Sequence, residues 1–70
     1  TNFDGEFRSF PDVVGKTVKQ AQEYFKLHFP QYDVHILPEG SLVTMDIRYD
    51  RVRVFYNPRT NRVDETPFVG

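Results

Sequence analysis

Three arginines follow closely behind an aspartate and a threonine in the middle of this 70-residue chain: Arg48, Arg51 and Arg53, after Thr44 and Asp46. Arg51 and Arg53 are two positions apart, so in a strand both side chains lie on one face, where they can reach Asp46. A planar guanidinium can hold a carboxylate and a carbonyl or hydroxyl oxygen at once, in fixed geometry. We therefore expect the arginines to act as a clamp that makes the segment around Asp46 rigid without a disulfide.

Catalytic chemistry of the chain's own has little support. His28 and His35 are its only histidines, and it has no cysteine. Neither histidine has a serine or aspartate at a spacing that suggests a catalytic triad, and two isolated histidines do not predict a metal site. We expect neither enzymatic activity nor a cofactor.

Length and composition indicate one small domain near the lower size limit for folding on a hydrophobic core alone. The absence of cysteine excludes disulfides and thiolate zinc sites, and an aromatic content of 16% compensates through large buried areas. A net charge of −1 provides no overall field to attract nucleic acid or an anionic membrane. No apolar run approaches the length of a membrane span, so we expect a soluble mature chain. A removed signal peptide would leave no trace in it.

One helix is predicted over residues 18–28. Thr17 followed by Gln20 fits a capping box, in which each side chain satisfies a backbone N–H of the other residue. Pro30 ends the helix at about Phe29, because the residue before a proline disfavours the α conformation.

Two strands are predicted, over residues 33–38 and 51–56, with a short edge strand near Val63. The segment between the first two strands is too long for a hairpin and long enough for a parallel crossover. We therefore expect an α+β fold, in which one helix packs on a small mixed sheet and a long exposed loop joins a parallel strand pair. Residues 1–70 form the single domain, and residues 1–8 are predicted to be a mobile arm.

The predicted loop spans residues 40–49 and is apolar without a helical or strand period. Such a crossover can simply fold back on the core and carry no function. However, long structureless loops in compact domains are uncommon and usually functional. Ordering a flexible residue costs about 1–2 kcal/mol, and a loop already held in its bound shape avoids most of that loss. A rigid, extended, apolar loop is what a protease cleft accepts.

The chain closely resembles the potato inhibitor I family of serine protease inhibitors. The matching stretches are SFPDVVGKTV, LPEGS, VT before the expected scissile position, RYDRVRVFYNP and the closing Val69-Gly70. The resemblance implies a substrate-like, tight-binding inhibitor whose loop is cleaved extremely slowly between Met45 and Asp46. It implies protease contacts through further loop residues: Leu42, Val43, Thr44 and Ile47.

The same resemblance assigns roles to the supporting residues. Arg51 and Arg53 are expected to hydrogen-bond and ion-pair with Asp46 and Thr44. Arg48 is expected to join this cluster through the C-terminal carboxylate of Gly70.

Serine proteases are the partners that the resemblance implies. The thioether of Met45 suits the apolar pockets of subtilisin-like, chymotrypsin-like and some elastase-like enzymes, whereas a trypsin-like pocket would be left with an unpaired charge. No nucleic acid or membrane partner is expected, and the chain is expected to be a monomer. The resemblance also implies a secreted or extracellular protein.

Two other hypotheses belong to different classes. A nucleic-acid-binding module would grip single strands with arginines and interleaved aromatics, here Arg48, Arg51, Arg53, Arg59 and Arg62 with Phe55 and Tyr56. The net charge of −1 and the absence of lysine after Lys26 speak against it. An inert, redesigned scaffold would fold well and leave proteases untouched.

Overall fold

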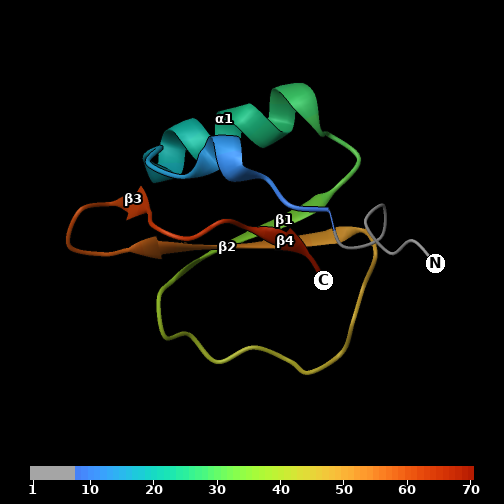
Figure 1. Ribbon diagram of the computed structural model, residues 1–70. Helices are drawn as coiled ribbons and strands as arrows, with labels where there is room; N and C mark the ends of the chain where they lie inside the picture. The colour runs from blue at the N-terminus through green and yellow to red at the C-terminus, as the bar shows by residue number, and fades with distance from the viewer. Residues whose placement is uncertain (1–7) are drawn as a thin grey trace.

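The computed structural model describes residues 8–70. A 3-10 helix, η1 (Pro11–Val13), precedes the single α-helix, α1 (Val18–His28). Four strands follow: β1 (Asp33–Pro38), β2 (Arg51–Asn57), β3 (Arg62–Val63) and β4 (Phe68–Val69). In Figure 1 the helix lies above the sheet, and the long segment between β1 and β2 hangs below it. The predicted α+β fold, with one helix on a small mixed sheet, is confirmed.

The bounds of α1 follow from local chemistry. The Thr17 hydroxyl accepts a hydrogen bond from the Gln20 backbone N–H at 3.2 Å, and the Gln20 side chain accepts one from the Thr17 N–H at 3.0 Å. At the other end, the Phe29 N–H donates to the Phe25 carbonyl at 2.8 Å just before Pro30. The capping box and the proline thus fix both ends of the helix where the sequence predicts them.

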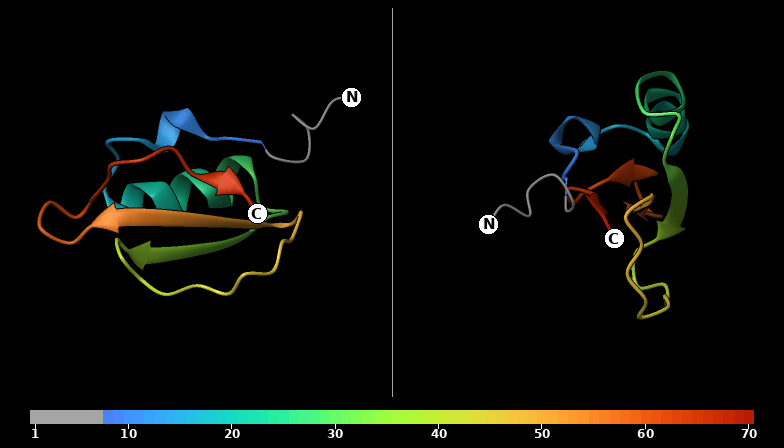
Figure 2. Two further views of the ribbon diagram at one scale, coloured as in Figure 1. Left: turned by 60° about the horizontal axis from the view of Figure 1, so that its bottom comes forward. Right: turned by 90° about the vertical axis from the view of Figure 1, so that its right-hand side faces the viewer.

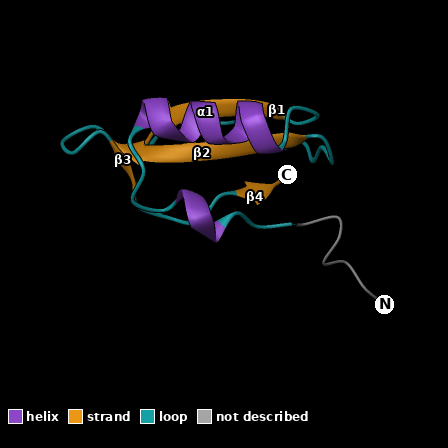
Figure 3. Ribbon diagram, turned by 90° about the horizontal axis from the view of Figure 1, so that it is seen from above, coloured by secondary structure: helices purple, strands orange, loops and turns teal. Residues whose placement is uncertain are grey.

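β2 is the central strand of the sheet. It pairs in parallel with β1, and Asp33 and His35 lie opposite Arg51 and Arg53. Its other edge is shared by two short antiparallel strands, β3 at one end and β4 at the other. Figure 3 shows η1 beside β4, apart from the helix that covers β1 and β2. The sequence predicts β3 near Val63 but neither β4 nor η1.

The hydrophobic core lies between α1, η1 and the sheet. Phe10 packs edge-on against Phe25 and Phe29, with ring centroids 5.0 Å apart in both pairs. The buried apolar residues are Phe10, Val13, Ala21, Phe25, Val52, Val54, Val63 and Val69. Because strand side chains alternate, burying Val52 and Val54 on the helix side places Arg51 and Arg53 on the opposite side.

The predicted mobile arm falls outside the described residues except for its last member, Arg8. That residue is held in place: its carbonyl accepts a hydrogen bond from the Val69 N–H at 2.9 Å, and its guanidinium lies 4.6 Å from the centre of the Phe29 ring. Arg8 therefore lies against β4 and the Phe29 ring, and the mobile arm stays a prediction.

Candidate functional site

Residues 39–50 join β1 to β2 on the side of the sheet that faces away from α1 (Figure 2). Their apolar side chains point into solvent: Leu42 is 99% exposed, Met45 94% and Ile47 63%. Val43 is the least exposed of the four, at 39%. A loop that folded back on the core would bury these groups. This one presents them, so the hypothesis of a loop packed on the core is wrong.

The loop leaves β1 through a tight turn. Gly40 has a φ of +85°, a left-handed conformation that glycine adopts without steric cost. The Pro38 carbonyl accepts hydrogen bonds from the Ser41 N–H at 3.2 Å and from the Ser41 hydroxyl at 2.6 Å. Within the described residues, the backbone from 42 to 47 makes no hydrogen bond to another backbone group, so side chains must hold it.

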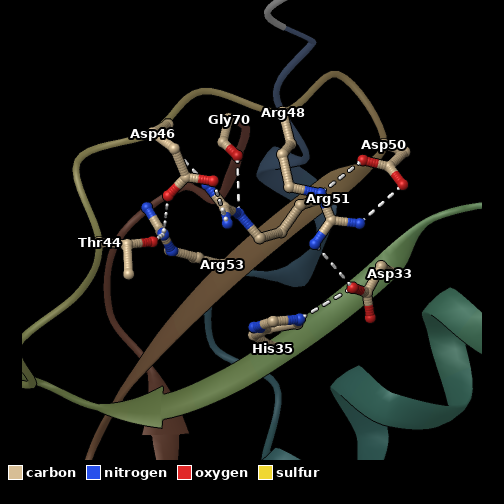
Figure 4. Close-up of polar contacts among 9 residues, drawn as sticks. All are labelled: Asp33, His35, Thr44, Asp46, Arg48, Asp50, Arg51, Arg53 and Gly70. Carbon is tan, nitrogen blue, oxygen red and sulfur yellow. Dashed lines mark hydrogen bonds and ion pairs between the residues drawn. The ribbon is translucent and has the colours of Figure 1, made fainter.

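Arg51 is the main support of the loop (Figure 4). Its Nη1 and Nη2 donate to Asp46 Oδ2 at 3.2 Å and to the Asp46 carbonyl at 2.9 Å, and its Nε donates to the Gly70 main-chain oxygen at 2.9 Å. The residue is only 4% exposed, and a cation so buried is costly unless it is paired and hydrogen-bonded. Arg51 therefore ties β2, the loop and the end of β4 to one another.

Arg53 supports the loop two residues before Asp46, at Thr44. Its Nη2 donates to the Thr44 hydroxyl at 2.8 Å and lies 3.9 Å from Asp46 Oδ1. Thr44 precedes Met45 and Asp46 follows it, so both neighbours of Met45 are fastened to β2 while the Met45 side chain itself remains free. We call these four residues, Arg51, Arg53, Asp46 and Thr44, the main clamp. The contacts are those that the sequence predicts for the two arginines.

Arg48 differs from the expectation. Its guanidinium contacts Asp50 and Asp33 rather than Gly70. Gly70 is instead held by Arg51, and Arg48 reaches it only through its backbone N–H, at 3.4 Å from the Gly70 oxygen. The Gly70 oxygen thus accepts from Arg51 Nε and from the Arg48 backbone, while two carboxylates pair with the Arg48 guanidinium.

The sequence does not predict Asp33 and His35 as parts of the site. His35 Nε2 lies 3.0 Å from Asp33 Oδ2, although the sequence suggests no such partner for this histidine. Both residues lie on β1 at alternate positions, on the same side of the sheet as Arg51 and Arg53. The two-residue spacing was available from the sequence, whereas the parallel register that brings β1 beside these arginines was not.

The carboxylates around the loop are held in their charged form. The Thr44 hydroxyl and then the Arg51 guanidinium lower the pKa of Asp46 below its usual value. Hydrogen bonding from Arg48 lowers the pKa of Asp50, and His35 followed by Arg48 lowers that of Asp33. Each of these carboxylates therefore favours the folded arrangement only while it is ionised.

A pH dependence follows for Asp46. Because its pKa is lower in the folded chain, its ionised carboxylate stabilises the fold above its unfolded pKa, about 3.9, and this contribution is lost as the pH falls through the folded pKa. We expect Asp46→Asn to lower the free energy of unfolding at neutral pH, and the difference from the parent to shrink toward zero below about pH 4. Urea unfolding of both chains across this range measures it. A difference independent of pH would mean that the charge of Asp46 does not act in the clamp.

Two negative findings concern the described residues alone. Between residues 8 and 70, no three histidine, cysteine, aspartate or glutamate side chains come together in a way that could hold a metal ion. Over the same residues, no helix has the length and apolar character needed to span a membrane.

Comparisons with known proteins agree with this architecture. The model of the potato inhibitor I family matches residues 4–70. Eglin C of Hirudo medicinalis is 69% identical over 70 residues, which cover the whole of both chains. Subtilisin inhibitor CLSI-I of Canavalia lineata is 34% identical over 62 residues, covering 89% of this chain and 92% of that one. The crystal structure of bitter gourd trypsin inhibitor matches with a TM-score of 0.78 and 35% identity, over 89% of this chain and 90% of its own. The chain belongs to the potato inhibitor I family.

Proposed function

We propose that the chain is a substrate-like, tight-binding inhibitor of serine endopeptidases and that Met45–Asp46 is its reactive bond. The observation that carries the proposal is the contrast at Met45, whose side chain is 94% exposed although both neighbours are fastened to β2 by arginines. Family membership supports the same activity. The relatives are named as inhibitors rather than enzymes, which supports the expectation that the chain catalyses no reaction itself.

The mechanism uses the catalytic groups of the protease. Its serine hydroxyl attacks the Met45 carbonyl carbon while the oxyanion hole holds the carbonyl oxygen. Collapse of the tetrahedral intermediate breaks the bond to Asp46, forms an ester at Met45 and leaves a free amine on Asp46. The main clamp keeps that amine beside the ester, so it re-attacks, restores the peptide bond and returns the proton to the serine. Resealing then competes with hydrolysis by water, and the complex persists.

Specificity is assigned to the exposed side chains of the loop. Met45 fills the main specificity pocket of the protease. Leu42, Val43 and Thr44 occupy its subsites on the acyl side of the reactive bond, and Ile47 occupies one on the leaving-group side. An unbranched thioether fits apolar pockets, so the proposed targets are subtilisin-like, chymotrypsin-like and elastase-like enzymes, bound by a monomer of this chain. The name of the Canavalia relative supports the first of these targets.

The nucleic-acid hypothesis loses its support, since its arginines are already paired. Arg51 and Arg53 hold the loop, Arg48 contacts two aspartates, and Arg62 donates to the Gly15 carbonyl at 2.7 Å. Of the five arginines in that hypothesis, Arg59 alone has no side-chain hydrogen bond or ion pair to the described residues; its backbone N–H donates to the Asn57 side chain. An inert scaffold remains as one outcome of the test below.

Titration of protease activity tests the proposal. Increasing amounts of the chain should abolish the activity of subtilisin and of chymotrypsin at about one chain per enzyme, with little effect on trypsin. Mass spectrometry of the recovered chain should find slow scission at Met45–Asp46 alone. Full protease activity beside excess intact chain would identify an inert scaffold, and rapid cutting without inhibition would show that the clamp does not hold.

A further inference from the structure

A second polar cluster, formed by Arg48, Asp50 and Asp33, lies at the end of the loop just before β2. The Arg48 guanidinium uses all three of its nitrogens there. Nε and Nη2 donate to the two carboxylate oxygens of Asp50 at 3.0 and 2.7 Å, and Nη1 lies 3.2 Å from Asp33 Oδ2. A bidentate guanidinium–carboxylate pair extended by another carboxylate is the kind of exposed ion-pair network that contributes measurably.

Asp33 connects this cluster to the rigid sheet. It is the first residue of β1, opposite Arg51 in the parallel register, and its backbone N–H donates to the Asp50 carbonyl at 2.7 Å. His35, two positions along the same strand, holds Asp33 Oδ2 at 3.0 Å. Figure 4 shows Asp33 and His35 on β1, with Asp33 joined to Arg48, while the two arginines of the main clamp come from β2. The loop is thus fastened to two different strands.

We propose that Arg48, Asp33 and Asp50 form a second anchor that positions the leaving side of the reactive bond, with His35 holding Asp33 in place. Arg48 is two residues beyond Asp46. When the Arg48 side chain is fixed, Ile47 alone lies between the main clamp at Asp46 and the second anchor. When that side chain is free, the segment after Asp46 can move as far as Asp50, whose carbonyl accepts a hydrogen bond from the Asp33 N–H at 2.7 Å.

The consequence for the proposed function, on which this inference rests, concerns resealing. The Asp46 amine must stay beside the Met45 ester, and each residue that becomes free to move lowers the chance of finding it there. Asp33 and Arg48 are positioning residues, because the bond is broken and formed at Met45 and Asp46. The second anchor therefore shifts the balance between intact and cleaved chain. Its loss lowers the stability of the fold by no more than one exposed ion pair contributes, because the core lies on the other side of the sheet.

The test compares this balance in the parent and in Asp33→Asn, which keeps the size of the side chain and removes its charge. Each chain is incubated at pH 7 with a trace of subtilisin until the ratio of cleaved to intact chain is constant, and mass spectrometry measures the ratio. We expect Asp33→Asn to raise it about fivefold, the effect of losing one well-placed exposed ion pair. The midpoint of urea unfolding should move little, and Asp33→Glu, which keeps the charge, should return the ratio toward the parent value.

A double-mutant cycle separates positioning from a general structural effect. Arg48→Met alone should raise the ratio at least as much as Asp33→Asn, and adding Asp33→Asn to Arg48→Met should change nothing further. Glu23→Gln, at an exposed position of α1, is the matched control and should leave the ratio at its parent value. An unchanged ratio for Asp33→Asn, or an effect that persists in the Arg48→Met background, would overturn the second anchor.

Failure of the proposed function gives a different pattern. If the parent chain neither inhibits subtilisin nor is cut at Met45–Asp46, that function is wrong and the anchor falls with it. If the parent does both while Asp33→Asn has no effect, the anchor alone is wrong.

Discussion

Replacing Arg51 with methionine should make subtilisin cut the chain at Met45–Asp46 about a hundredfold faster than it cuts the parent. Methionine keeps the apolar stem of the side chain and removes the three Arg51 donors, which contact the Asp46 side chain, the Asp46 carbonyl and Gly70. Hydrogen bonds to charged groups contribute about 1.5–3 kcal/mol each, so losing the two to Asp46 costs about 3 kcal/mol, which corresponds to roughly two orders of magnitude. Mass spectrometry of timed digests measures the rate.

Two further substitutions make this prediction specific. Arg53→Met removes one short hydrogen bond and one long ion pair, so it should accelerate cleavage less than Arg51→Met while the fold is retained. Arg59→Met changes an exposed arginine in the turn after β2, away from the loop, and should leave the rate unchanged. Equal cleavage rates in the parent and both clamp variants, measured on folded chains, would refute the clamp.

Replacing Met45 with lysine should transfer inhibition from subtilisin and chymotrypsin to trypsin. Because the Met45 side chain is 94% exposed, the substitution leaves the fold intact. Lysine supplies the cation that the aspartate of a trypsin pocket needs, whereas an apolar pocket would have to bury that cation unpaired. We expect inhibition constants to improve for trypsin and to worsen for the other two enzymes by about a hundredfold or more, since a few kcal/mol are at stake in each case.

Leu27→Lys is the matched control for this change. It also converts an exposed apolar side chain to lysine, but on α1, on the opposite side of the sheet from the loop. It should leave all three inhibition constants as they are. An unaltered preference in Met45→Lys would mean that another residue fills the main pocket.

Much of the fold could be predicted because its signals are local. The capping box at Thr17 and the proline at position 30 act within a few residues of the helix ends, and the length of the loop alone separates a parallel crossover from a hairpin. β4 could not be found in this way. It has two residues, Phe68 and Val69, too few to show a period, and it forms only because β2 offers a free edge beside it.

The contacts of the candidate site likewise include some that the sequence predicts and some that it does not. The two-residue spacing of Arg51 and Arg53 places both on one face, and family resemblance supplied their partners, Asp46 and Thr44. The partners of Arg48 depend on the register between β1 and β2, which brings Asp33 to the foot of the loop. No spacing in the sequence encodes that register, so the sequence could not predict that Arg48 contacts Asp33. The side chain that contacts Gly70 is Arg51 instead.

The central claim is that the clamped loop keeps the two ends of its broken bond together, and resealing tests it most directly. Chain cut at Met45–Asp46 is purified without separating its halves and incubated with a trace of subtilisin, and mass spectrometry follows the loss of the one added water. We expect intact chain to reappear and to reach the same ratio to cleaved chain that is obtained when starting from intact material. Cleaved chain that never reseals, or that is degraded further at other bonds, would contradict it.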